Sequence, residues 1–255
     1  MAATASAESC PVCGGTGWRM LPGAAGAPAR ATRCDCHFAR RAAELLAAAN
    51  IPPRYEHCTL DNFHTEGSRE LFLAHQTAIA YARDFPPDTN RGPRGLLLYG
   101  GVGAGKTHLA VAIAAKLLER GFGCRFVDHR ALLKQIQATF DPANPATEAG
   151  VVQPLLEAEV LVLDDLGVGR ATDWALETLH YILNHRYMNN GATIVTTNLE
   201  DREPRSRLAA ADSPDPGSLL DAVGERLRSR LYEMCVFVAL HGSDFRRTYA
   251  APVVR

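Results

Sequence analysis

The feature that most constrains this chain is the segment Gly100–Thr107, which fits the pattern G-x-x-x-x-G-K-[ST] at every position. An apolar run, GLLLY (95–99), precedes it, and a segment of helical composition (106–120) follows. Glycines let successive main-chain N–H groups curl around an anion, and the following helix places its positive end there. The segment therefore predicts a triphosphate-binding loop between a buried strand and a helix.

The residues of this loop have separate expected roles. Lys106 is expected to reach the β- and γ-phosphates of ATP, and Thr107 to offer its hydroxyl to a magnesium ion. The other positions are expected to bind phosphate through main-chain N–H groups. The predicted cofactor-binding residues are Gly100, Gly101, Val102, Gly103, Ala104, Gly105, Lys106 and Thr107.

A second apolar run, VLVLDDLG (160–167), contains two adjacent carboxylates. Acids are costly to bury, and the carboxyl end of a parallel strand opens on the crevice where a nucleotide binds. We therefore expect Asp164 to hold magnesium through a water molecule. Asp165 is expected to polarise or orient the water that attacks the γ-phosphate.

Asn198 ends another apolar run, ATIVTTN (192–198). A polar amide at that edge can hydrogen-bond the γ-phosphate or the attacking water, which makes Asn198 a candidate catalytic residue. Thr196 and Thr197 are the alternatives at the same strand end.

From residue 95 onward, strand and helix patterns alternate, which predicts a parallel sheet covered by helices on both faces. Upstream, Ser68 is expected to cap a helix, and two prolines to keep residues 51–63 extended. Loops are expected over 141–150 and 201–217. The expected strands are 95–99, 124–128, 160–165, 192–198 and 236–240, and the expected helices are 38–49, 67–84, 106–120, 130–139, 172–188 and 219–233.

Four of the seven cysteines, Cys10, Cys13, Cys34 and Cys36, lie near the N-terminus with the spacing C-x2-C and C-x-C. Four thiolates in this pattern predict a structural zinc site, with His37 as an alternative ligand to Cys36. A segment so poor in large apolar residues needs a metal in order to fold. The expected parts are a zinc-binding module over 1–40, a helical linker region over 41–93 and an ATPase domain over 94–255.

Composition bears on how the chain can bind DNA, whether it contacts a membrane and in which compartment it is expected. The net charge is −1, so any affinity for DNA has to come from local patches. No apolar run approaches the ~18 residues needed to span a membrane, and the N-terminus has no secretory signal pattern. We therefore expect a cytoplasmic protein without membrane contact. The scattered cysteines Cys58, Cys124 and Cys235 are expected to be buried, reduced and hydrophobic in role.

Arg226 and Arg230 are four residues apart in ERLRSRL (225–231), so they share one face of the expected helix, whereas Arg228 points elsewhere. Such a face can direct a guanidinium at the γ-phosphate of a neighbouring subunit, where transition-state charge develops. A solvated basic face is the other interpretation. Arg246 in GSDFRR is a second candidate, which would act within its own subunit.

These segments together resemble the DnaC/DnaI/IstB group of AAA+ proteins, which load the replicative helicase or assist transposition. The matching stretches are IPPRYEHCTLDNF, LLLYGGVGAGKTHLAVAIA, VLVLDDLG, HRYMNNGATIVTTNL, ERLRSRLYEM and GSDFRR, across residues 50–250. The resemblance implies a magnesium-dependent ATPase. It places Lys106 and Thr107 in Walker A, Asp164 and Asp165 in Walker B, Asn198 at sensor one, Arg230 at the arginine finger and Arg246 at sensor two.

The resemblance also implies partners. Residues 128–155 fall where family members contact single-stranded DNA, and Lys134 and Gln135 are the obvious candidate side chains there. The first expectation is a helicase loader that acts in DNA replication, self-associates with ATP and holds the helicase through its N-terminal module. The second is a transposase helper. The third is a slowly hydrolysing, nucleotide-gated binding module, because Asp165 is shorter than the Glu that many related ATPases carry.

Overall fold

The computed structural model describes residues 10–21, 29–65, 67–87, 92–167, 172–202 and 217–245. Its centre is a five-stranded sheet in the order β4-β5-β6-β3-β7, with every neighbouring pair parallel. The expected parallel sheet is confirmed. Its strands are β3 (Gly95–Gly100), β4 (Cys124–Asp128), β5 (Val160–Leu166), β6 (Ala192–Thr197) and β7 (Cys235–Leu240).

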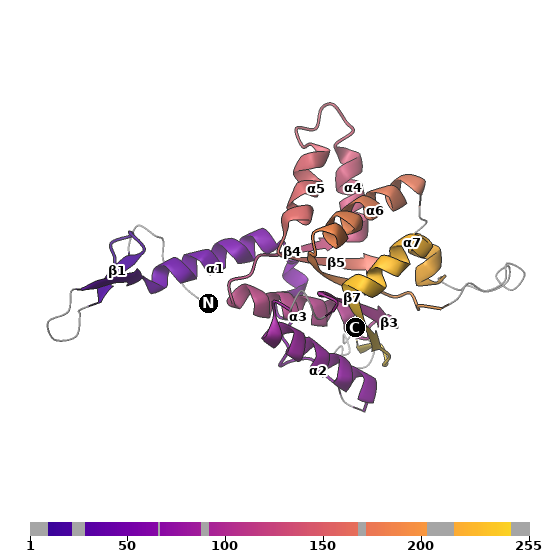
Figure 1. Ribbon diagram of the computed structural model, residues 1–255, viewed down its shortest axis with the longest axis horizontal. Coiled ribbons are helices and arrows are strands. Elements are labelled where there is room, and N and C mark those ends of the chain that lie inside the picture. The colour runs from indigo at the N-terminus through magenta and orange to yellow at the C-terminus, as the bar shows by residue number, and fades with distance from the viewer. Residues whose placement is uncertain are drawn as a thin grey trace, which may run out of the picture.

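Helices cover both faces of this sheet (Figure 1). Alternate residues of a strand point to opposite faces, so Leu96 and Leu98 join one apolar core while Leu97 joins the other. One face carries α1 (Asp35–Ala49), α2 (Arg69–Asp84) and α3 (Lys106–Glu119), and the other carries α4 (His129–Ala138), α5 (Glu148–Glu157), α6 (Asp173–Met188) and α7 (Leu219–Met234).

The order of the strands determines where a ligand can bind. After β3 the chain crosses to β4 at one edge of the sheet and returns through β5 to β6, which pairs with β3. The chain then passes to β7 on the other side of β3. Strand order therefore reverses around β3, and the carboxyl ends of β3, β5 and β6 open onto one crevice.

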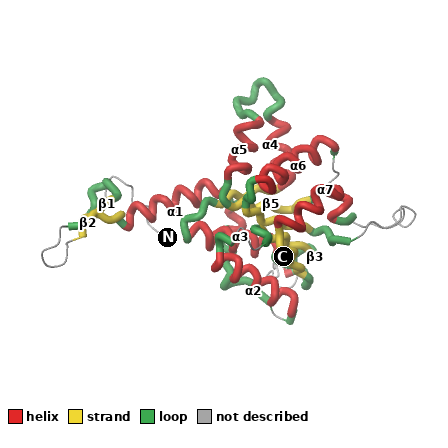
Figure 2. The backbone as a smooth tube through the Cα atoms, viewed as in Figure 1, coloured by secondary structure: helices red, strands yellow, loops and turns green. Residues whose placement is uncertain are grey.

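The N-terminal part of the chain extends from the body of the molecule (Figure 2). It consists of an antiparallel hairpin, β1 (Trp18–Leu21) and β2 (Arg30–Arg33), followed directly by α1. This hairpin was not expected from the sequence. Helix α1 is continuous through residues 40 and 41, and its far end packs on the sheet through Leu45 and Ala49.

Three local differences from the sequence expectations have physical causes. The expected loop over 141–150 runs into α5, whose N-cap is Thr147 and which contains Pro154; the proline and the short apolar segment concealed this helix. Pro53 occupies the first position of a 3₁₀ helix, η2 (Pro53–Tyr55), where its missing N–H costs nothing. Gly224 has φ of 75°, which interrupts α7 after its first turn.

Among the described residues, every helix is too short or too polar to cross a lipid bilayer.

Candidate nucleotide-binding site

The segment Gly100–Thr107 connects the end of β3 to the first turn of α3, which is the position expected for it. Gly103 and Gly105 have φ of 78° and 94°, values that residues with a Cβ rarely adopt. The Lys106 side chain is buried, and its ammonium donates to the main-chain oxygens of Gly100 at 2.9 Å and Gly101 at 2.6 Å. The loop is therefore curled around the lysine that is expected to contact the phosphates.

Asp164 lies beside this loop, at the carboxyl end of β5. Its Oδ1 atom accepts hydrogen bonds from Thr107 Oγ1 at 2.9 Å and from Thr196 Oγ1 at 2.6 Å. Burial raises the pKa of the Asp164 carboxyl to about 6, although the two hydroxyls act in the opposite direction. Thr107 and Asp164 thus lie together as oxygen ligands suited to Mg²⁺.

Asp165 and Asn198 lie together at the ends of β5 and β6. Asp165 has φ of 55°, at a bulge in the β5–β6 pairing between Leu163 and Leu166. Asn198 Nδ2 is 3.5 Å from Asp165 Oδ1, at the outer limit of a hydrogen bond, and both residues line one cavity. The bulge therefore directs Asp165 toward the cavity while Asp164 stays buried.

The two threonines that precede Asn198 make hydrogen bonds to the end of the neighbouring strand β5. Thr196 is fully buried; besides its bond to Asp164, its hydroxyl accepts from the main-chain N–H of Asp165 at 3.0 Å. Thr197, equally buried, donates to the main-chain oxygen of Leu166 at 2.7 Å. Neither lines the cavity, which leaves Asn198 as the candidate at this edge.

A third carboxylate, which the sequence analysis missed, lies in the same cluster. Asp128 ends β4, and carboxylate oxygens of Asp128, Asp164 and Asp165 lie within 4.8 Å of one another. Asp128 Oδ1 also accepts from the N–H of Ala131 at 2.7 Å, which caps α4. The signal was present in the sequence, because Asp128 ends an expected parallel strand, and the carboxyl ends of such strands face the same crevice.

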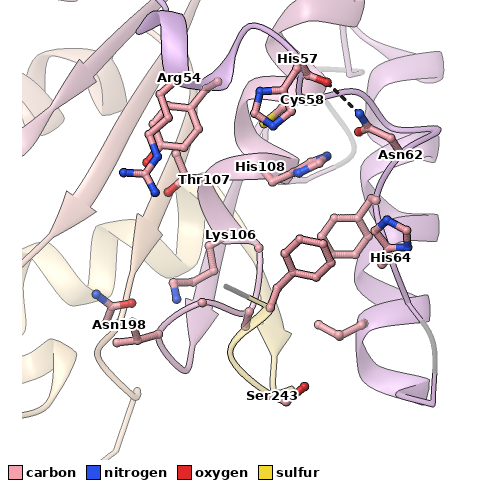
Figure 3. A pocket seen from close by; sticks show the side chains of 18 of the residues that line it. Arg54, His57, Cys58, Asn62, His64, Lys106, Thr107, His108, Asn198 and Ser243 are labelled. Atoms are coloured by element: carbon pink, nitrogen blue, oxygen red, sulfur yellow. Dashed lines mark hydrogen bonds between the residues drawn. The ribbon is translucent and has the colours of Figure 1, made fainter. Parts of the chain in front are cut away.

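A cavity of about 510 Å³ opens beside the phosphate loop (Figure 3). Lys106, Thr107, Asp165 and Asn198 line one part of it. The opposite wall comes from residues 54–64. Most of them belong to the segment 51–63, which is expected to be an extended connector and is one of the stretches that carry the family resemblance. The lining residues of this wall include Arg54, Tyr55, His57, Cys58, Asn62, Phe63 and His64.

Contacts across the cavity hold this wall against the loop. Phe63 occupies the space that a side chain at Gly105 would need. The Nε2 atom of His108, on α3, is 2.9 Å from the main-chain oxygen of Thr59. Asn62 Nδ2 donates to the main-chain oxygen of His57 at 2.8 Å, which stabilises the turn of the wall (Figure 3). The cavity is therefore preformed by segments about 50 residues apart.

The segment after β7 borders the loop from a third direction. The N–H of Phe245 donates to the main-chain oxygen of Gly103 at 3.2 Å, and the Phe245 ring stacks on His64 with 5.3 Å between centroids. Asp244 occupies the space beside Gly103 where a Cβ would lie. Arg246, the expected sensor-two residue, lies outside the described residues.

The arginines of α7 lie elsewhere. Arg226 and Arg230 line an open groove between α6 and α7, and neither lines the cavity. The Arg230 guanidinium lies 5.6 Å from the ring centroid of Tyr187. Arg228 points away, as expected, and donates through Nε to Asp201 at 2.6 Å.

The four N-terminal cysteines come together where the chain enters and leaves the hairpin, two before β1 and two after β2. The Sγ atoms of Cys10, Cys13, Cys34 and Cys36 all lie within 4.8 Å of one another. Cys10 and Cys34 are 3.8 Å apart, and Cys13 and Cys36 are 3.3 Å apart. Four Zn–S bonds of ~2.3 Å in a tetrahedron place the sulfurs about 3.8 Å apart, so the cluster fits zinc. The side chain of His37 lies outside the described part of the chain.

Comparisons with known proteins agree with this geometry. The family model for IstB-like ATP-binding proteins matches residues 36–246. The uncharacterized protein YqaM of Bacillus subtilis is 29% identical over 210 residues, 80% of this chain and 60% of YqaM. The replicative helicase loader DnaC of Buchnera aphidicola is 24% identical over 158 residues, 62% of each chain. This chain thus spans less than two thirds of either relative.

Solved structures include a crystal structure of the DnaC helicase loader, with 31% identity and a TM-score of 0.60 over 74% of this chain and all of that one. A crystal structure of DnaI, at 22% identity and a TM-score of 0.57, shares the fold. The phosphate loop, the buried Asp164 and the family match lead to one conclusion: the chain belongs to the IstB-like ATP-binding protein family and is related to the DnaC helicase loaders.

Proposed function

We propose that this protein is a magnesium-dependent ATPase that acts in DNA replication as a helicase loader. The observation that carries the proposal is that Lys106, Thr107, Asp165 and Asn198 line one cavity, with Asp164 bonded to Thr107 beside it. These are the groups that nucleotide hydrolysis needs: phosphate donors, oxygen ligands for a metal and a carboxylate near the attacking water. The relatives that are named helicase loaders supply the role in replication.

Each side chain has a separate task in the proposed reaction. Lys106 binds the phosphates. Thr107 and Asp164 would hold a magnesium ion, which would supply positive charge to neutralise the phosphates. Asp165 accepts the proton of the attacking water or orients it, and the Asn198 amide holds that water or the γ-phosphate. Their placement on three neighbouring strand ends gives the rigid positioning that phosphoryl transfer requires.

Arg230 is proposed to act between subunits. It lines the groove between α6 and α7 and not the cavity, so a guanidinium from this face would have to complete the site of a second copy. ATP would then drive self-association, because its γ-phosphate is the group that the guanidinium contacts. The proposed active form is an ATP-dependent homo-oligomer.

The N-terminal cysteines are proposed to hold a structural zinc ion; the proposal is supported by the four sulfurs, which lie within 4.8 Å of one another. Zinc would stabilise the hairpin, which has few large buried side chains. Elemental analysis of protein purified under reducing conditions should give one zinc per chain, and Cys13→Ser should lower it. Protein without zinc would remove this proposal.

Residues 128–155 are proposed to contact single-stranded DNA. In the structure this segment comprises α4, the loop after it and most of α5, which together form a projecting arm (Figure 1). Lys134 and Gln135 are exposed on α4, where they could reach a strand outside the body.

Retention of the chain on an immobilised replicative helicase from the same genome tests the loader role. Retention should require ATP, fail with ADP and fail for Lys106→Ala. Phosphate release with Mg²⁺, with EDTA and with single-stranded DNA tests the enzyme separately. No ATP-dependent retention would exclude the loader role, whatever the turnover.

The family match supports one alternative, an ATP-dependent helper of a transposase. The same experiment with immobilised transposase distinguishes the two, because only one partner should retain the ATP-bound chain. A slow, nucleotide-gated binding module is the remaining alternative. It predicts ATP-dependent association with little phosphate release, and rapid turnover would exclude it.

A further inference from the structure

One face of the N-terminal hairpin carries an exposed aromatic ring between exposed apolar and basic side chains. The β1–β2 register pairs Trp18 with Arg33 and Met20 with Ala31. Cross-strand partners share a face, and alternate residues of one strand share it too, so these four side chains lie together. Trp18 is 47% exposed and Met20 is 64% exposed, and Ala31 and Arg33 are exposed as well.

The stacking of Arg33 on Trp18 makes this face suited to a flat, negatively charged ligand. Its guanidinium carbon lies 3.9 Å from the centroid of the Trp18 ring, over the ring face. A planar cation stacked on an indole keeps both groups extended and reduces the conformational freedom lost on binding. The two groups thus form a preordered surface of one ring and one cation.

The charge around this surface points to a polyanion. Residues 10–41 contain five arginines and one aspartate. Of these arginines, Arg33 lies on this face, Arg19 lies on the other face, and Arg40 on α1 lies 3.6 Å from Glu44. The balance stays positive even with zinc bound, because a zinc tetrathiolate has a net charge of about −2. The chain as a whole has a net charge of −1, so the positive charge is local to this module.

The remainder of the described structure does not account for this face. The other face of the hairpin carries Arg19 and Thr32, which are partly buried. The match to the family model begins at residue 36, so the hairpin lies outside the part that places the chain in its family. A specific protein interface needs about 800 Å² from each partner, more than two four-residue strands of ~13 Å can offer. A nucleotide base, by contrast, can stack on a single aromatic ring.

We propose that this face binds single-stranded nucleic acid by stacking a base on Trp18, with Arg33 contacting the adjoining phosphate. Bases stack on exposed aromatic rings regardless of sequence, and arginines beside the ring neutralise the backbone. The site needs neither ATP nor a protein partner. It goes beyond the proposed function, because it is separate from the arm 128–155, and it adds a second DNA contact next to the N-terminal end of α1.

Tryptophan fluorescence tests the stacking directly. The chain has two tryptophans, Trp18 and Trp174, so Trp174→Phe leaves Trp18 as the sole reporter. Oligothymidylate added to this full-length variant without nucleotide, at low salt, should quench the Trp18 emission. Trp18→Ala in the unaltered background should weaken binding of a labelled oligothymidylate about 5- to 150-fold, the range expected for one stacked base.

Matched variants separate stacking from loss of structure. Leu21→Ala changes an exposed residue on the opposite face and should leave binding unchanged, and Trp18→Phe should retain most of it. Arg33→Ala should reduce the slope of log affinity against log salt by about 1. Zinc content and circular dichroism identify variants whose hairpin no longer folds. In place of such a variant, Trp18→Phe and the quenching of Trp18 emission in the Trp174→Phe chain test the stacking.

Two results would overturn the inference. One is unchanged Trp18 emission at oligonucleotide concentrations at which the fluorescence anisotropy of the labelled oligothymidylate shows that the chain is fully bound. The other is loss of protein-partner retention in Trp18→Ala with oligonucleotide binding intact, which would make the face a protein-docking surface. Neither result affects the proposed function, because ATP-dependent association with the helicase is measured separately and depends on Lys106.

Discussion

The hydroxyl of Thr107 lies 2.9 Å from Oδ1 of Asp164 and joins the first turn of α3 to the end of β5 across 57 positions of sequence. Thr196 Oγ1 donates to the same oxygen at 2.6 Å. Two hydroxyls from two elements thus orient one buried carboxylate. The arrangement suits a metal site in which ligand directions are set before the ion arrives.

Asp164→Asn should raise stability and abolish turnover together. Burial raises the pKa of this carboxyl to about 6, so above pH 6 the folded state bears the cost of a buried charge that the unfolded state avoids. Removing the charge should stabilise the ligand-free protein at pH 7 by on the order of 1–3 kcal/mol. Thermal unfolding at pH 5 and pH 7.5 measures this. The gain should be larger at pH 7.5, and an equal gain at both would contradict the assignment.

Lys106→Ala should lower ATP affinity without unfolding the chain. The ammonium supplies positive charge where the phosphates bind, and it donates to the main-chain oxygens of Gly100 and Gly101. The affinity should fall at least about 10-fold, the effect of losing one charged contact of ~1.5–3 kcal/mol. Titration with a fluorescent ATP analogue measures it. Lys116→Ala, an exposed lysine on the same helix, is the control and should bind normally.

Arg230→Ala should reduce turnover about 10³-fold with nucleotide affinity retained, because the guanidinium acts on the transition state at a neighbouring site. Arg226→Ala, in the same groove, is the matched control. Mixing Arg230→Ala with Lys106→Ala should restore part of the turnover, since each subunit supplies what the other lacks. Failure of the mixture to recover would argue against action between subunits.

Arg186→Leu should destabilise the fold strongly. This buried guanidinium donates to the main-chain oxygens of Leu155 at 2.9 Å and Ala158 at 3.0 Å, and to Thr193 Oγ1 at 2.9 Å. It thereby satisfies carbonyls at the end of α5 that no helix bond can reach. Loss of these hydrogen bonds should lower the free energy of unfolding by about 3–5 kcal/mol, which urea unfolding measures. Arg186→Lys should recover part of this, and an equal loss for both would point to packing alone.

The contact made by His241 should weaken as pH rises. Its Nδ1 lies 2.9 Å from Glu70 and its Nε2 lies 3.0 Å from Glu200, so both nitrogens can donate only when the ring is charged. The bond to Glu200, followed by that to Glu70, raises the pKa of His241 above its usual value. The stabilisation is therefore complete below pH ~6.5 and is lost as pH rises through the raised pKa.

The test compares the melting temperature of the wild type with that of His241→Gln from pH 6 to pH 8.5. The difference should be largest at pH 6 and should shrink as pH rises. Tyr99, whose ring centroid is 6.1 Å from that of His241, also faces the contact but does not titrate in this range. A difference that does not change with pH would show that the charge on His241 plays no part.

Much of the site could be predicted from the sequence because its signals are local. The loop Gly100–Thr107 carries its own glycines, lysine and threonine, and the strands on each side are continuous apolar runs. Asp164 and Asn198 could be placed because the ends of parallel strands share one edge. The spacing of Cys10, Cys13, Cys34 and Cys36 indicated a common cluster for a similar reason, since each pair lies within one short turn.

What the sequence could not determine depends on contacts between distant segments. Phe63 reaches Gly105 only because residues 51–65 fold back across α3, and Phe245 reaches Gly103 only because the chain after β7 returns to the loop. The sequence by itself thus determined the phosphate loop, the strands and their chemistry, since those depend on neighbours along the chain. Tertiary structure alone decided the cavity walls, the exposed face around Trp18 and the separation of Arg230 from its own nucleotide site, because burial and distance are properties of packing.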